Sequence, residues 1–110
     1  MIKPGEVQKI KTGVAVALDP GTAGLILPRS GLALKQGLRP ANTPGLIDAD
    51  YRGEIIVALY NDSDNIQYFK AGSRIAQMVV IPYISEGFYL VEDLDETERG
   101  IGSFGSTGLK

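Results

Sequence analysis

The chain has 110 residues, of which 44% are hydrophobic and 22% charged, the size and composition of a single globular domain. It contains neither cysteine nor histidine, so disulfide frameworks, thiol chemistry, histidine triads and zinc fingers are excluded. A net charge of −2 argues against a broad nucleic-acid interface, and no apolar run is long enough for a transmembrane helix or a signal peptide, so we expect a cytoplasmic protein that binds neither nucleic acid nor a membrane.

Short β-strands are predicted along most of the chain, because apolar residues recur at every second position between turns. The six predicted strands are residues 14–18, 23–27, 54–60, 66–69, 74–81 and 88–91. Helical periodicity is limited to a single turn at residues 30–34, with Ser30 as its N-cap. Short strands at intervals of about 8–12 residues indicate an all-β sandwich or barrel, which we expect to form one domain over residues 1–98.

Two places along this pattern carry groups that suit phosphate. Arg29, Ser30 and Gly31 follow a predicted strand and offer a guanidinium, a hydroxyl and accessible backbone amides, although a surface turn has the same composition. Gln77 introduces an amide into an otherwise apolar strand. A buried amide needs hydrogen-bond partners, so Gln77 either holds two elements together or points into a site.

A turn with two carboxylates, Asp48 and Asp50, precedes the predicted strand at residues 54–60. Because the chain has no histidine, a general base would have to be an aspartate, a glutamate, a lysine or a tyrosine. An ordinary aspartate-rich hairpin turn fits the same residues, and Tyr51 fits equally well as a core ring with its hydroxyl at the surface.

The last twelve residues, 99–110, contain four glycines and two serines, too many for a core strand. A frayed tail has such a composition, but Arg99 and Phe104 add a cation and an aromatic ring to it. We therefore expect a mobile C-terminal arm that closes over a ligand with phosphates and a base.

Together and in this order, these segments resemble four of the five motifs of the homotrimeric dUTP diphosphatases, the dUTPases. The matching segments are LPRSGLA at 27–33, GLIDADYRGEI at 45–55, RIAQM at 74–78 and RGIGSFGSTG at 99–108. The resemblance implies a dUTPase-like β jelly roll of the β-clip type, with a C-terminal arm that becomes ordered on binding. It also implies an enzyme that hydrolyses dUTP to dUMP and pyrophosphate.

The resemblance further implies roles for residues of the second of these segments and for Asn42, which precedes it. Asp48 is expected to be the general base that activates the water attacking the α-phosphorus. Tyr51 is expected to stack under the deoxyribose and exclude a 2′-hydroxyl. Uracil is expected to be read by Asn42 and by the backbone around Leu46 and Ile47.

The phosphate chain and the closing arm account for the other contacts that the resemblance implies. The first segment is expected to hold the phosphate chain, Gln77 to bind near the α-phosphate, Arg99 to reach the γ-phosphate and Phe104 to cover the uracil. The residues implied to contact the substrate from the phosphate-binding segments and from the arm are Arg29, Ser30, Gly31, Gln77, Arg99, Phe104, Gly105 and Ser106.

The family also implies a cofactor and an assembly. Mg²⁺ is expected to enter with the triphosphate, with no residue of this chain as its direct ligand, and the active sites are expected to be shared between the subunits of a homotrimer. The family's first motif, Ala-Gly-Tyr-Asp-Leu, would lie before Lys3 and is absent, so the chain is expected to be N-terminally shortened. Ser103 also departs from the family, which commonly has glycine there.

Two alternatives remain open at this point. The chain could be a nucleotide-binding or regulatory protein of the dUTPase fold with weak or no turnover, which the missing first motif favours, whereas the presence of Asp48 favours the enzyme. The dCTP deaminases share the fold, but the Gly-Ser-Phe-Gly-Ser-Thr-Gly sequence of the arm favours the dUTPases.

Overall fold

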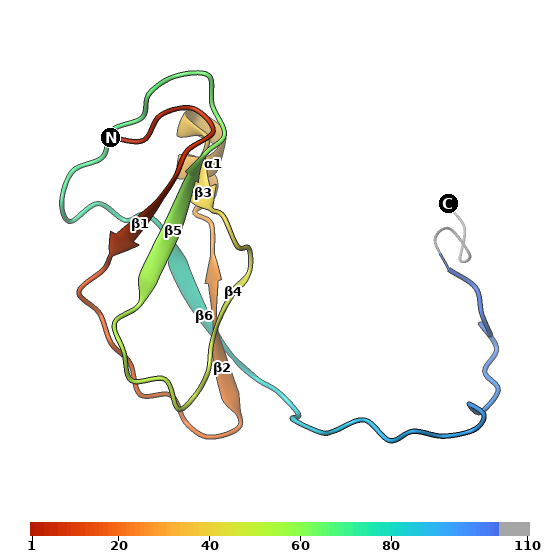
Figure 1. Ribbon diagram of the computed structural model, residues 1–110. Helices are drawn as coiled ribbons and strands as arrows, with labels where there is room; N and C mark the ends of the chain where they lie inside the picture. Colours follow the sequence, from red (N-terminus) through yellow and green to blue (C-terminus); the bar gives the residue numbers. More distant parts are fainter. Residues whose placement is uncertain (104–110) are drawn as a thin grey trace.

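The computed structural model describes residues 1–103, and over this part of the chain it contains six β-strands and one short helix (Figure 1). The strands form two antiparallel three-stranded sheets. One sheet has the order β1-β5-β3, with β1 at Val7–Lys11, β5 at Ile56–Asn61 and β3 at Leu38–Pro40. The other has the order β4-β2-β6, with β4 at Gly45–Ile47, β2 at Thr22–Leu27 and β6 at Gln77–Pro82. The helix α1 spans Ser30–Gln36, and the predicted all-β class is confirmed.

The hydrophobic core joins the two sheets. Strand β5 buries Val57 and Leu59 and leaves Ile56 exposed, as the two-residue repeat of a strand requires. Strand β2 buries Ile26 from the other sheet. The buried members of this core are Ile2, Ile26, Leu38, Ile55, Val57 and Leu59.

A buried amide connects this core to the first residues of the chain. The Asn61 side chain is fully buried at the end of β5, and its Nδ2 donates hydrogen bonds to the carbonyl oxygens of Ile2 (2.9 Å) and Asn65 (2.7 Å). Its Oδ1 accepts from the backbone N–H and the hydroxyl of Ser63. Because a buried amide without partners is costly, this network stabilises the loop after β5 and the strand-like pairing of Ile2 with Gln67.

Three of the predicted strands form with shifted ends, and they correspond to β2, β5 and β6. Residues 14–18 form no strand; the Val14 carbonyl accepts a hydrogen bond from the Ile55 N–H, just before β5, and no ladder of strand pairing follows in the described residues. Residues 66–69 contribute a single bridge at Gln67 instead of a strand. Strands β1, β3 and β4 were not predicted from the sequence, because the polar and charged residues of β1 do not alternate with its apolar ones and the other two strands have three residues each.

The helix is longer than predicted, and its N-cap is Arg29 rather than Ser30. Arg29 has extended backbone angles and makes no side-chain capping bond, whereas Ser30 is already the first helical residue. Gly37 ends the helix in the left-handed conformation, with its N–H bonded to the carbonyls of Ala33 and Leu32.

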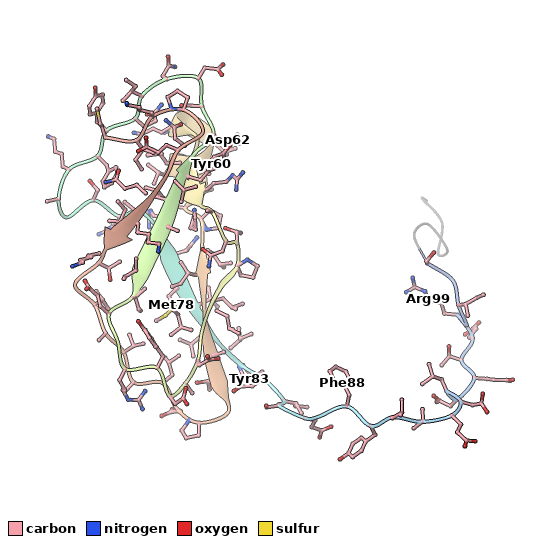
Figure 2. All side chains as sticks on the ribbon, viewed as in Figure 1. Tyr60, Asp62, Met78, Tyr83, Phe88 and Arg99 are labelled. Carbon is pink, nitrogen blue, oxygen red and sulfur yellow. The ribbon has the colours of Figure 1, made fainter. Side chains whose placement is uncertain are left out.

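After β6 the chain leaves the sheets as an extended segment (Figure 1). Residues 83–103 contain no strand or helix, and the predicted strand at 88–91 has no pairing partner among residues 1–103. Figure 2 shows Phe88 and Arg99 on this segment, away from both sheets. In residues 1–103, no helix is long and apolar enough to cross a bilayer.

Candidate functional site

The phosphate-suited residues come together where β2 ends and β6 begins. Leu27 pairs with Gln77, and the Gln77 side chain donates a hydrogen bond from Nε2 to the Pro28 carbonyl at 2.9 Å. Gln77 is exposed, not buried as the apolar pattern of the strand suggested, and through this hydrogen bond it performs the first of the two roles left open, holding two elements together. Arg29 is half-buried beside it, and Ser30 is exposed at the start of α1.

A cleft of about 560 Å³ opens beside this corner. Its floor is apolar and comes from both sheets, with Ile26, Val57 and Met78 among its residues. Four cationic side chains line the cleft, those of Lys11, Arg29, Lys70 and Arg74. The described residues that line it include no carboxylate. This charge distribution favours an anion at the cleft mouth.

The turn between β4 and β5 is closed by its own backbone and side chains. The Tyr51 N–H donates to the Asp48 carbonyl at 3.1 Å, and the Tyr51 hydroxyl donates to the Glu54 carbonyl at 2.8 Å. From Arg52, Nη1 donates to the Ala49 carbonyl at 2.6 Å and to the Tyr51 carbonyl at 3.3 Å. The Asp48 side chain is exposed on this closed turn, and Asp50 is exposed as well.

The residues predicted to read uracil lie in β4 and in the loop before it. Asn42 lies in the loop before β4, with Nδ2 about 3.4 Å from the position that a side-chain carbon on Gly45 would occupy. It also lines a second, more open hollow of about 490 Å³ on the β1-β5 face. Leu46 is exposed and Ile47 half-buried, and both belong to the edge strand of their sheet.

Within one chain these two groups of residues do not meet. Ile47, just before Asp48, pairs with Gly24, whereas Gln77 pairs with Leu27 on the opposite edge of β2. Three residue steps separate Gly24 from Leu27, about 10 Å along the strand, and two strand spacings add about 10 Å across the sheet. The predicted base is therefore too far from the predicted phosphate contacts to act with them in a single chain.

The arm forms a third group. The Arg99 side chain donates from Nε to the Gly102 carbonyl at 2.8 Å and lies far from the sheets (Figure 2). Phe104, Gly105 and Ser106 lie outside the described residues. The predicted substrate contacts thus fall on three separate parts of the chain.

The positions of the carboxylates also bear on metal binding. In residues 1–103, no group of three or more aspartate and glutamate side chains is arranged to hold a metal ion.

Three residues of the turn and the cleft were given no role from the sequence. Arg52 and Gly53 shape the turn, and Arg74 lines the cleft. All three lie inside the segments at 45–55 and 74–78, so their position in these segments was the available signal.

Comparisons with known proteins agree on one family. The dUTPase family model matches residues 1–108. The deoxyuridine 5′-triphosphate nucleotidohydrolases of Hahella chejuensis and Cutibacterium acnes are 48% and 52% identical to the chain, over 99% and 98% of its length, and each alignment covers 72% of the relative. The solved structure of the Staphylococcus bacteriophage 80alpha dUTPase with dUpNHpp is 32% identical, with a TM-score of 0.82 over 98% of this chain and 79% of that one.

Proposed function

The chain belongs to the dUTPase family, and on that premise we propose that it hydrolyses dUTP to dUMP and pyrophosphate. The observation that carries the proposal is a match of about half the residues, over nearly the whole chain, to enzymes named deoxyuridine 5′-triphosphate nucleotidohydrolase. The fold agrees, since two antiparallel sheets superpose on a jelly-roll dUTPase.

We assign the proton transfer to Asp48. A water molecule beside its exposed carboxylate attacks the α-phosphorus, and the carboxylate takes the proton that the water loses. The new bond joins the water oxygen to the α-phosphorus, and the bond from this phosphorus to the bridging oxygen of the leaving pyrophosphate breaks. The closed turn that carries Asp48 supports this role, because its hydrogen bonds hold the backbone on which the carboxylate stands.

Donors from the other groups neutralise the charge that collects on pyrophosphate. We assign the phosphate contacts to Arg29, Ser30, Gly31 and Gln77, and the γ-phosphate contact to Arg99. The absence of carboxylates among the described residues of the neighbouring cleft supports an anion at this corner. Tyr51, Asn42 and the backbone at Leu46 and Ile47 are assigned to the sugar and the base.

The proposal includes a homotrimer with shared active sites. Within one chain the turn of Asp48, the corner of Gln77 and the segment of Arg99 lie apart, so a complete site needs more than one subunit. The extended segment supports assembly as well, since Phe88 and Leu90 are 104% and 103% exposed. Large apolar side chains in such numbers are normally covered by a partner.

We propose that magnesium enters with the substrate, held by the oxygens of the triphosphate. Bound there, it would offset the negative charge of the phosphates. The described residues do not form a protein cage for it, so their part is to bind the phosphate chain through nitrogen and hydroxyl donors.

The proposed function is tested by incubating the purified chain with dUTP and Mg²⁺ and separating the products by ion-exchange chromatography. Release of dUMP and pyrophosphate in equal amounts is the expected result. dCTP serves as the control substrate and should remain intact. Nucleotide binding without release of dUMP would favour the alternative of a binding or regulatory protein, and deamination of dCTP would favour the related deaminases.

A further inference from the structure

Gly53 lies against the phenol end of the Tyr51 side chain. A Cβ built on Gly53 would be 2.5 Å from the Tyr51 hydroxyl oxygen, 2.7 Å from Cζ and 3.0 Å from Cε1. Real Cβ atoms essentially never approach other atoms to less than 3.0 Å. Gly53 is not among the glycines with positive φ, so its backbone does not demand glycine. Glycine is therefore favoured at this position by the available space, because the Tyr51 ring occupies the volume that a side chain would fill.

The ring has one other anchor among the interactions of the turn. Its hydroxyl donates to the Glu54 carbonyl, which fixes the phenol end of the ring. Tyr51 is 42% exposed, so close packing in the core does not hold it. Contact with the Gly53 backbone and the hydrogen bond at the tip together hold the ring in its position.

We propose that Gly53 is a positioning residue for Tyr51 and that, through the position of this ring, it sets the preference of the site for deoxyribose over ribose. The inference rests on the proposed function, in which Tyr51 stacks under the sugar. A stacked ring excludes a 2′-hydroxyl only while it stays close to the sugar, and a displacement of about 1 Å is enough to matter in a pre-organised site. A methyl group on Gly53 would displace the ring, because the clash is with the rigid phenol rather than with the end of a flexible chain.

The experiment compares the parent with Gly53→Ala in the binding of dUMP and UMP, measured by isothermal titration calorimetry, and in kcat/KM for dUTP and UTP. The parent should prefer the deoxyribonucleotides, and Gly53→Ala should reduce this preference about tenfold or more. A variant that only loosens the fold would weaken both nucleotides equally and leave their ratio unchanged.

A second pair of variants separates the clash from other effects of the substitution. In a Tyr51→Ala background there is no ring to displace, so adding Gly53→Ala should change neither the preference nor the unfolding temperature. If the double variant loses a further share of the preference, or fails to fold where Tyr51→Ala folds, Gly53 acts in another way and the proposal is overturned. This comparison holds even if Gly53→Ala alone does not fold.

Tyr51→Phe tests the sugar preference without altering Gly53. It removes the hydrogen bond to the Glu54 carbonyl and keeps the contact of the ring with Gly53, so it should lower the preference by less than Gly53→Ala does. A loss as large as that of Tyr51→Ala would assign the positioning to the hydroxyl and overturn the proposal. A parent that binds dUMP over UMP but releases no dUMP from dUTP would refute the proposed activity and leave this inference standing. A parent that hydrolyses dUTP while Gly53→Ala retains the full preference would support the proposed activity and overturn this inference.

Discussion

Asp48 and Gln77 lie beside opposite ends of strand β2 and on its opposite edges. The residue before Asp48 pairs with Gly24 through β4, and Gln77 pairs with Leu27 through β6. Both positions are set by backbone pairing, so side-chain rotation cannot bring the two groups together. A reaction that needs both must recruit one of them from a second copy of the chain.

The first prediction concerns assembly. The chain should form a homotrimer of about three times 11.8 kDa, because the exposed apolar residues of the segment at 83–94 then gain partners. Multi-angle light scattering on the eluting protein measures this mass directly. A stable monomer with full activity would contradict both the trimer and the shared site.

The second prediction concerns the sharing of active sites. Asp48→Asn and Gln77→Ala chains should each be impaired alone, and should recover activity when they are unfolded, mixed and refolded together. Some sites in mixed trimers then receive an intact Asp48 from one subunit and an intact Gln77 from another. Refolding each variant by itself is the control. A mixture no more active than the average of its two components would mean that one chain supplies both groups.

The third prediction concerns the general base. Asp48→Asn keeps the shape of the side chain but cannot accept a proton, so the turnover of dUTP should fall about 10²–10⁴-fold. Affinity for dUMP should change far less. Asp50→Asn, two residues away and equally exposed, is the matched control and should stay near the parent rate. If the two variants exchanged these results, Asp50 would be the base.

The fourth prediction concerns stability. Asn61→Ala should lower the free energy of unfolding by about 2–4 kcal/mol, because it removes the hydrogen bonds of the buried amide to the Ile2 and Asn65 carbonyls and to Ser63. Urea unfolding followed by circular dichroism measures the change. Asn65→Ala keeps the backbone carbonyl that Asn61 uses, so it should cost much less. Equal losses in the two variants would show that the buried amide is not what holds this loop.

The fifth prediction concerns the arm. Removal of residues 99–110 should leave the unfolding temperature unchanged, since the Arg99 side chain bonds within its own segment at Gly102 and the core lies elsewhere. Turnover of dUTP should nevertheless fall steeply, because the arm is proposed to supply a γ-phosphate contact and to exclude water. Phe104→Ala should reproduce part of the loss, about 1–3 kcal/mol if the ring stacks on uracil. Full activity without the arm would make it a dispensable tail.

Sequence periodicity predicted β2, β5 and β6, because each is a long run of apolar residues bounded by turns. It failed for β1, whose sequence VQKIK has the charge of a surface loop and becomes a strand by pairing with β5. It failed in the opposite sense at residues 14–18, where an alternating apolar pattern pairs with no strand in the described part of the chain. A strand forms when two segments pair, and the sequence pattern of one segment does not show whether a pairing partner lies beside it.

The sequence by itself determined the chemical groups that the chain has and its family, because the motif segments are local and need no knowledge of their neighbours. It excluded histidine and thiol chemistry and singled out Asp48 as a candidate base. Only the tertiary structure decided which of these groups share a place. The register of β4 and β6 on β2 separates Asp48 from Gln77, and the fold of the turn puts the Tyr51 ring against Gly53. The physical reason is that residue types can be read directly from the sequence, whereas the distances between side chains depend on strand pairings that join positions far apart in the chain.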